Sequence, residues 1–233
     1  MPVPWRSRLA VLLVLALAIP GALRAQEATE DSTAITLARE GLPLKPERKL
    51  EFTTREGSWI SLDVSPDGKT IVFDLLGDLY TLPIEGGKAT PLTQGMAFDA
   101  QPRFSPDGKR IVFTSDRGGG ENVWILSLDL KDTIQVTKGK GNVYHSPEWT
   151  PDGKYVVVTK GTGSAPAKLW IYHVDGGSGA QLIKGPETIR TSGAAFGPDG
   201  RYVWFARRAG TWRYNSPGAD YQLAVYDRET GQI

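Results

Sequence analysis

The sequence of 233 residues contains no cysteine. Disulfide bonds and lipid attachment through a cysteine are therefore excluded, and the folded chain has to be stabilised by its core alone. Long hydrophobic runs are also missing. The apolar run Leu9 to Ile19 contains eleven residues, which is too few to cross a hydrocarbon layer of roughly 30 Å.

This short run has the surroundings of a secretory signal peptide. Two arginines precede it, a Pro-Gly pair ends it, and the small residue Ala25 follows. The pattern predicts cleavage after Ala25, so that residues 1–25 are the signal peptide and the product is periplasmic or secreted, without a membrane span. Residues 26–49 are polar and of mixed charge, and we interpret them as a leader.

An excess of basic residues is likewise missing. Lys and Arg number 27 against 26 Asp and Glu, and no basic stripe carries interleaved aromatic residues. Such a stripe is what a nucleic-acid-binding surface requires, so nucleic acid is excluded as a partner. The sequence also has no Gly-x-Ser-x-Gly segment, and a hydrolase nucleophile of that type is therefore absent from these residues.

What the sequence does contain is a fourfold repeat. Residues 65–73 read SPDGKTIVF, and close copies follow at 105–113, 150–158 and 197–205. The spacings between the repeat prolines are 40, 45 and 47 residues. In each copy proline, aspartate and glycine favour a tight turn, and a short run of β-branched and aromatic residues follows. A period of this length with several short strands is typical of a β-propeller blade.

The repeats predict an all-β fold of four-stranded antiparallel blades over residues 50–233. In the first blade we expect strands near Trp59–Val64, Thr70–Leu75, Asp78–Ile84 and Ala89–Leu92. Residues 49–54 alternate apolar and polar side chains, which predicts a lone strand that closes the ring. Four tryptophans at blade positions are expected to fill the space between sheets: Trp124, Trp149, Trp170 and Trp204.

About four blades are visible, and the fourth lacks a predicted outer strand. Propellers have roughly four to eight blades, and an unclosed ring would leave an unpaired edge and an open blade face. We therefore expect an incomplete ring that belongs to a longer protein.

With the Pro-Asp-Gly series and the segment Thr114–Gly119 (TSDRGG), the chain resembles the TolB-like propellers of bacterial envelope proteins from about Leu50 onward. In TolB itself a separate α/β domain precedes the propeller. Here the first blade begins too soon after the predicted cleavage site to leave room for such a domain, so TolB itself is disfavoured. Residues 56–64 (EGSWISLDV) and 74–83 (DLLGDLYTLP) look like the opening of exported metal-dependent amidohydrolases that place such a propeller before a catalytic barrel.

This resemblance implies an N-terminal propeller that acts as a scaffold, access or binding domain for a downstream catalytic domain. In that family a His-x-His pair binds a divalent metal in the barrel, whereas this sequence has only the separate His145 and His173. No catalytic or metal-binding residue is therefore expected here, and any metal would belong to the downstream domain. The alternatives are a non-enzymatic periplasmic protein-binding propeller and the propeller of a prolyl-oligopeptidase-type peptidase.

Candidate binding residues lie where each first strand begins. First strands line the central channel of a propeller, so their first residues surround one mouth. These residues are aromatic or charged, which suits a polar ligand or a peptide of a partner: Trp59, Asp99, Tyr144, His145 and Arg190. Solvated lining residues without a ligand are the alternative interpretation. The repeat aspartates Asp67, Asp107, Asp152 and Asp199 are expected to act in turns and not as calcium ligands.

Overall fold

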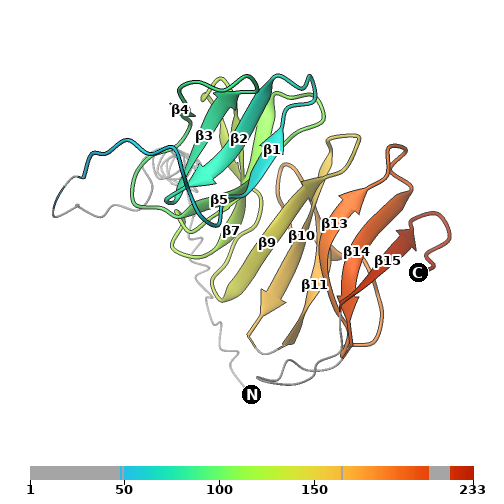
Figure 1. The fold of residues 1–233 in the computed structure, drawn as a ribbon. Helices are drawn as coiled ribbons and strands as arrows, with labels where there is room; N and C mark the ends of the chain where they lie inside the picture. The colour runs from blue at the N-terminus through green and yellow to red at the C-terminus, as the bar shows by residue number, and fades with distance from the viewer. Residues whose placement is uncertain (1–47, 49, 164, 210–220) are drawn as a thin grey trace, which may run out of the picture. The chain divides into compact units, whose positions relative to one another are not determined.

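Every regular element of the described residues is a β-strand. The structure is a computed structural model that describes residues 48, 50–163, 165–209 and 221–233. Figure 1 shows how four antiparallel sheets follow one another along the chain. The predicted all-β propeller with about four blades is confirmed.

Three of the four sheets have four strands, and each sheet keeps the order of the sequence. Blade 1 consists of β1 (Leu62–Val64), β2 (Thr70–Leu75), β3 (Asp78–Pro83) and β4 (Thr90–Pro91). Blade 2 consists of β5 (Asp99–Phe104), β6 (Arg110–Ser115), β7 (Asn122–Ser127) and β8 (Thr133–Gln135). Blade 3 consists of β9 (Asn142–Trp149), β10 (Tyr155–Thr162), β11 (Ala165–His173) and β12 (Ala180–Gln181). Blade 4 consists, within the described residues, of β13 (Arg190–Phe196), β14 (Tyr202–Arg208) and β15 (Gln222–Asp227).

The Pro-Asp-Gly segments form the turns between the first and second strands. In blade 2 the Ser105 hydroxyl donates to Asp107 Oδ1 at 2.5 Å and accepts from Arg110 N at 2.9 Å, while Lys109 N donates to the same aspartate oxygen. Gly108 has a φ of 68°, the left-handed conformation that glycine adopts without strain. These aspartates therefore act in turns, as expected.

Three apolar clusters join consecutive blades. Val72 and Leu79 of blade 1 pack on Ile111, Phe113 and Trp124 of blade 2. A second cluster joins blade 2 to blade 3, and a third joins blade 3 to blade 4. Among the described residues, blades 1 and 4 share no such interface. The ring is therefore open between them.

Two sequence-based expectations are wrong. The segment 50–54 is not a strand, because no described strand lies beside it and Leu50 and Phe52 are mostly exposed. Trp204 is 45% exposed and not part of the core, because no described strand of another blade packs on that face of blade 4. By contrast, Trp124 and Trp149 are buried and Trp170 packs against the cluster between blades 2 and 3.

The signal peptide and nearly all of the leader lie outside the described residues. Over the part of the chain that the structure describes, no helix has the length and apolar character needed to cross a membrane.

Candidate functional site

Two of the five predicted mouth residues are buried. Asp99 begins β5 and is 1% exposed, and the guanidinium of Arg117 donates to its Oδ2. Arg117 also lies over the rings of Phe113 and Trp124, with its Cζ 5.0 and 5.8 Å from their centroids. Asp99 therefore forms a buried ion pair within blade 2 and is not on an accessible surface.

Tyr144 is the second buried residue of the five. It lies on β9, is 4% exposed, and belongs to the cluster between blades 2 and 3. Its ring meets Tyr172 edge to face at 6.2 Å between centroids. Edge-to-face aromatic packing of this kind stabilises a core, so Tyr144 packs the interior and does not line an open mouth.

The other three predicted residues are accessible. Trp59 precedes β1 and is 99% exposed. His145 on β9 and Arg190 at the start of β13 are partly exposed and lie close enough to interact. Burial, and then the positive charge of Arg190, lower the pKa of His145. The structure thus brings His145 and Arg190 together on adjacent first strands and leaves Trp59 apart from them.

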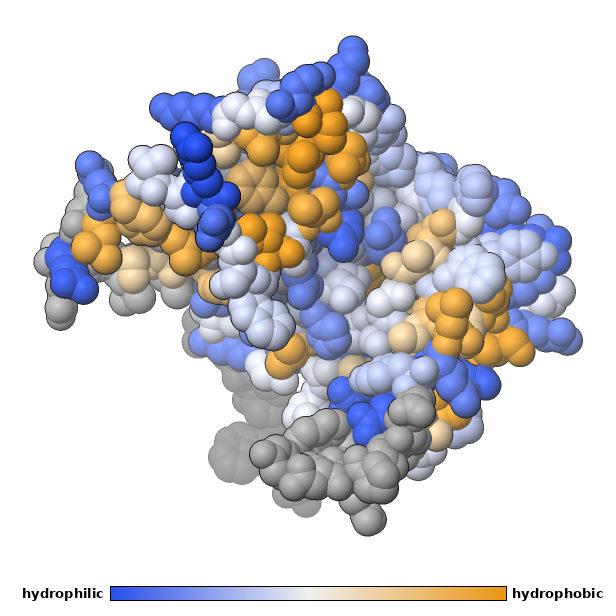
Figure 2. Space-filling view, viewed as in Figure 1, coloured by the Kyte–Doolittle hydropathy of each residue, from blue (hydrophilic) through white to orange (hydrophobic). Residues whose placement is uncertain are grey.

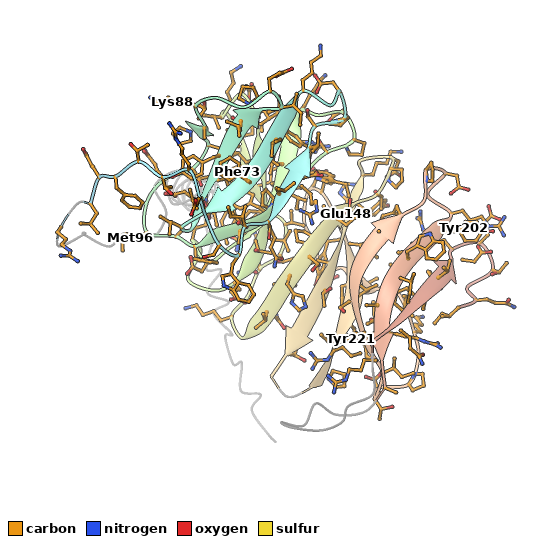
Figure 3. The ribbon with its side chains drawn as sticks, viewed as in Figure 1. Phe73, Lys88, Met96, Glu148, Tyr202 and Tyr221 are labelled. Atoms are coloured by element: carbon orange, nitrogen blue, oxygen red, sulfur yellow. The ribbon has the colours of Figure 1, made fainter. Side chains whose placement is uncertain are left out.

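A row of charged side chains crosses the first strands of blades 1, 2 and 3. Its members are Asp63 on β1, Arg103 on β5 and Glu148 on β9, and all three are partly exposed. Arg103 Nε lies 3.8 Å from Glu148 Oε2. Figure 3 labels Glu148 on β9, beside the strands of blade 2. We call Asp63, Arg103, Glu148, His145 and Arg190 the first-strand surface.

Hydrogen bonds between blades fix the row in place. Asp63 Oδ2 accepts from Phe104 N at 2.8 Å, and Arg103 Nη1 donates to Leu62 O at 3.0 Å. Trp149 Nε1 donates to Arg103 O at 3.1 Å. Asp63 and Arg103 therefore contact the backbone of a neighbouring blade, whereas Glu148 accepts from Trp149 N of its own strand at 3.1 Å. The bonds between blades also satisfy polar groups along the free edges of the first strands.

Backbone geometry at a bulge reinforces this connection. Gln101 in β5 and Ser146 in β9 have φ values of 58° and 53°, and the register of both strands shifts there. Asp74 Oδ2 of blade 1 accepts from Gln101 N at 2.7 Å, and Gln101 Oε1 in turn accepts from Ser146 N at 2.6 Å. The strained conformation is thus held by a hydrogen bond from the preceding blade.

Glu148 has the most perturbed carboxyl group of the row. Its pKa is raised to about 7, chiefly by burial; the positive charge of Arg103 opposes this shift, and the negative charge of Asp63 adds to it. A partly exposed group with a pKa near 7 can donate or accept a hydrogen bond under physiological conditions. Perturbed groups of this kind concentrate at functional sites.

Asp78 is a second perturbed carboxyl group, located at the start of β3. Its pKa is raised to about 6 by burial and, to a smaller extent, by the charge of Asp99, while Arg117 opposes the shift. Asp78 therefore lies beside the buried Asp99–Arg117 pair, at the interface between blades 1 and 2. Its position assigns it to that interface and not to the first-strand surface.

The turn aspartates have the opposite shift. A hydroxyl from Ser65, Ser105 or Thr150 lowers the pKa of Asp67, Asp107 and Asp152, respectively. Among the described residues no group of three or more His, Asp and Glu side chains is placed to hold a metal ion. The chemistry that the first-strand surface offers is polar recognition by two guanidinium groups, an imidazole and two carboxyl groups.

Sequence reasoning missed Asp63, Arg103 and Glu148. A signal was present, because each lies three residues before its repeat proline, at Pro66, Pro106 and Pro151. The same position in the fourth repeat is Ala195. A search for charged residues at a fixed offset from the turn would have found the row.

Comparisons with known proteins agree with this architecture. The family model described as TolB beta propeller domain matches residues 43–215. The chain belongs to this family.

Individual curated proteins are similar to parts of this chain. The chain is 32% identical to the Tol-Pal system protein TolB of Wolinella succinogenes over 120 residues, which are 49% of this chain and 28% of that protein. It is 31% identical to the uncharacterized peptidase YuxL of Bacillus subtilis over 147 residues, which are 61% of this chain and 20% of that protein.

The solved structure of a putative TolB from Agrobacterium tumefaciens shares the fold, with a TM-score of 0.55 at 18% identity over 77% of this chain and 80% of that one. The chain spans a third or less of the length of the curated relatives it matches. TolB and peptidase names recur among these relatives, and the resemblance to exported amidohydrolases has no counterpart among them.

Proposed function

We propose that this TolB-type propeller is a non-catalytic binding module of an exported protein, and that its first-strand surface binds a polar peptide segment. The observation that carries the proposal is the row of Asp63, Arg103 and Glu148, whose charged groups are partly exposed. Hydrogen bonds between blades hold Asp63 and Arg103, and Glu148 lies 3.8 Å from Arg103 across the next interface. A site fixed in advance loses little conformational entropy when it binds a ligand.

The chemistry of each side chain defines its role. Arg103 carries a permanent positive charge and suits a carboxylate or a backbone carbonyl of the peptide. Glu148, with its pKa raised to about 7, can accept from a peptide N–H or donate when protonated. Burial, and then the charge of Arg190, lower the pKa of His145 and so favour its neutral form, which has one donor and one acceptor.

A peptide-selection experiment tests this function. The chain is immobilised and incubated with a mixture of tetra- to octapeptides from a tryptic digest of casein, and the retained peptides are identified by mass spectrometry. We expect Arg103→Gln and Glu148→Gln to lower retention about tenfold, because a charge-assisted hydrogen bond contributes on the order of 1.5–3 kcal/mol. Lys88→Gln, which removes an exposed charge at the blade 1 turn, is the matched control and should retain peptides like the parent.

Two results would reject the proposal. One is a lack of any retained peptide at millimolar concentration, and the other is equal retention by the Arg103, Glu148 and Lys88 variants. Cleavage of the peptides by the purified chain would contradict the non-catalytic part alone.

The second part of the proposal concerns the larger protein that carries this propeller. Residues 56–64 and 74–83 resemble the opening of exported metal-dependent amidohydrolases, and we propose a scaffold and access domain for such a hydrolase. The similarity to peptidase YuxL supports a peptidase as the second candidate. A reading frame that continues into a His-x-His after a strand would support the amidohydrolase, whereas a Gly-x-Ser-x-Gly would support the peptidase.

A further inference from the structure

Two of the three interfaces between blades hold an arginine beside the Pro-Asp-Gly turn. Between blades 2 and 3, Arg110 Nη2 donates to Gly153 O at 3.3 Å, and Arg110 Cζ lies 4.9 Å from the centroid of the Trp149 ring. A guanidinium at this distance over an aromatic ring makes a cation–π contact. Arg110 of blade 2 therefore contacts a turn carbonyl and an aromatic ring of blade 3 at the same time.

The interface between blades 3 and 4 has the same contacts, made by an arginine of a different strand. Arg228, which follows β15, donates from Nη1 to Gly200 O at 2.7 Å, and its Cζ lies 5.8 Å from the centroid of Phe196. Gly200, like Gly153, is the second residue after its repeat proline. Phe196, like Trp149, lies two residues before that proline. Two arginines from different positions of the repeat therefore place a guanidinium at equivalent points.

The interface between blades 1 and 2 has other residues at both arginine positions. Thr70 is the fourth residue after its repeat proline, as Arg110 is. Leu128 takes the place of Arg228, because the backbone N–H of each donates to the residue after the turn glycine of its own blade. Neither Thr70 nor Leu128 can supply a guanidinium.

A cavity of about 260 Å³ lies at this place between blades 1 and 2. We call it the turn cavity, and its lining includes Asp67, Thr70, Phe104, Asp107, Gly108 and Leu128. Phe104 has the repeat position of Trp149. Gly108 has the repeat position of Gly153. Since roughly 10–15 Å³ is enough for one water molecule, the turn cavity has room for a larger polar group.

The backbone around the turn cavity is placed as in an interface that holds an arginine. A Cβ on Gly108 would lie 3.4 Å from a ring carbon of Pro66. A Cβ on Gly200 would lie 3.4 Å from a ring carbon of Pro151. In both places the turn of one blade packs on the repeat proline of the blade before it. The cavity therefore reflects the side chains at the two arginine positions and not a wider spacing of the blades.

A carboxylate makes the turn cavity suited to a cation. A hydroxyl hydrogen bond chiefly lowers the pKa of Asp107, and the charge of Arg110 lowers it further. The pKa of Asp152 is lowered chiefly by another hydroxyl and, to a smaller extent, by Arg228. The equivalent aspartate of the turn cavity is Asp67, whose pKa a hydroxyl hydrogen bond also lowers. Asp67 is therefore ionised near neutral pH, at the position where the other two interfaces place an aspartate near a guanidinium.

The turn cavity can be reached from solvent. Asp67 and Asp107 are exposed, and Gly108 and Thr70 are partly exposed. Figure 2 shows hydrophilic residues along the upper rim of blade 1, the side on which Figure 1 draws the turn between β1 and β2. The residues of the first-strand surface do not line this cavity, so it is separate from the proposed peptide-binding row.

We propose that the turn cavity binds a guanidinium group that an arginine side chain of a partner polypeptide supplies. The group donates to Gly108 O, lies against the ring of Phe104 and pairs with the carboxylate of Asp67. These contacts repeat the ones that Arg110 and Arg228 make in the other two interfaces. A polypeptide is the assigned source because both of those guanidinium groups belong to side chains of a folded chain.

Nuclear magnetic resonance of the ¹⁵N-labelled chain tests the proposal with three probes. They are acetyl-Gly-Arg-Gly-amide, the same peptide with citrulline in place of arginine, and free arginine. The arginine peptide at millimolar concentration should shift the amide signals of Gly108 and Phe104 in a saturable way. The citrulline peptide should bind at least about tenfold more weakly, because it has the shape of arginine without the charge that strengthens the hydrogen bonds. Free arginine should also bind more weakly, since its own carboxylate is repelled by Asp67.

A variant that supplies the guanidinium from within the chain gives a second test. Thr70→Arg places an arginine at the position that Arg110 has in the next blade, so it should abolish binding of the arginine peptide and raise the midpoint of thermal unfolding. Thr70→Val is the matched control. It keeps the size of the threonine side chain and should bind the arginine peptide like the parent.

The aspartates provide a pair of variants that leaves the cavity open. Asp67→Asn should weaken binding of the arginine peptide about tenfold, because a charge-assisted contact becomes a neutral one. Asp152→Asn is its control, since that turn lies at the interface where Arg228 is already present, and it should bind like the parent. Circular dichroism checks that every variant folds, and the aspartate pair decides the outcome if Thr70→Arg does not.

Three results would overturn the proposal. They are the lack of a saturable shift at Gly108 and Phe104, equal binding of the arginine and citrulline peptides, and undiminished binding of the arginine peptide to folded Thr70→Arg. Free arginine that binds as tightly as the arginine peptide would overturn the assignment to a polypeptide and identify a small guanidinium compound as the ligand.

Discussion

Blades 2 and 3 differ from blades 1 and 4 in what covers them, although all four carry the same turn and the same apolar run. Phe113 is 0% exposed, whereas Phe73, at the equivalent position of blade 1, is partly exposed and stacks on Tyr80 at 5.6 Å between centroids. The repeat therefore encodes a blade with two apolar faces, and only a neighbouring blade makes each face part of a core.

The polar contacts follow the same division. Arg103 and Glu148 of blades 2 and 3 interact across an interface, and Gln101 bridges to blade 3 through Ser146 N. The fourth repeat has Ala195 where the others have a charged residue. The charged row thus extends over blades 1, 2 and 3 and does not include this position of blade 4.

The largest effect should appear at the seventh repeat position. Phe113→Ala should lower the free energy of unfolding by about 3–5 kcal/mol, because it leaves a cavity in the cluster between blades 1 and 2. Phe73→Ala should lower it by less than about half as much, since part of that ring already contacts solvent. Urea unfolding followed by tryptophan fluorescence measures both, and equal losses would remove the distinction between covered and uncovered blades.

The buried ion pair gives the next largest effect. Arg117→Met should destabilise the chain by about 3 kcal/mol, because Asp99 would remain buried without its partner. Lys131→Met is the matched control. It removes the exposed pair with Asp129, whose side chains are 78% and 54% exposed, and should change stability by about 0–1 kcal/mol.

The double variant Asp99→Asn/Arg117→Met sharpens this test. It should recover part of the loss, since the uncompensated charge is gone. Thermal unfolding of the single and double variants compares them, and a double variant no more stable than Arg117→Met would contradict the assigned pair.

Glu148 predicts a pH dependence of stability. Its folded pKa of about 7 lies above its ordinary value of 4.5. The stability that this group contributes is therefore full below about pH 4.5 and is lost as pH rises through 7. The parent should lose about 1–3 kcal/mol of unfolding free energy between pH 4.5 and 7 through this group, and Glu148→Gln should not show that loss.

Asp78→Asn separates the two perturbed groups. Asp78 has a raised pKa of about 6, so it should change the unfolding free energy with pH only below about pH 6. Asp78→Asn should therefore leave the loss of stability between pH 6 and 7 unchanged. Urea midpoints measured from pH 4.5 to 8 give these slopes, and an unchanged slope in Glu148→Gln would contradict the assigned pKa.

The smallest effect concerns the turn of blade 4. Ser65, Ser105 and Thr150 each donate a hydroxyl hydrogen bond to the turn aspartate, whereas the fourth repeat has Gly197. A Cβ at Gly197 would lie 3.5 Å from Asp199 Oδ1, an ordinary contact. Gly197→Ser should therefore raise the unfolding free energy by about 0.5–1 kcal/mol.

Gly197→Ala is the control for this substitution, because it restricts the unfolded backbone without adding the hydroxyl. A serine variant no more stable than the alanine variant in thermal unfolding would show that the hydroxyl makes no useful contact.

Much of the fold could be predicted from local sequence. The predicted second strand of blade 1, Thr70–Leu75, is the observed β2, and the third strand was predicted to within one residue of β3. Both strands are bounded by turn residues whose preferences are local. The strand expected at residues 49–54 was wrong, because alternation alone does not provide a neighbouring strand to pair with.

The candidate site was less predictable. Of the five candidate binding residues, Trp59, His145 and Arg190 are accessible, whereas Asp99 and Tyr144 are buried. Asp99 meets Arg117 from the following hairpin, and Tyr144 meets Tyr172 from β11. Such partners come together only when strands pair and blades pack. The pKa of Glu148 likewise depends on burial first, and then on the charges of Arg103 and Asp63 from two other blades.

The amino-acid sequence specified the Pro-Asp-Gly turns, the strand type and the number of repeats, because turn geometry and β propensity act over a few neighbouring residues. Tertiary packing decided which apolar and charged side chains are covered. Burial and a shifted pKa require a second surface, and whether Val112 or Trp204 has one depends on the blade beside it.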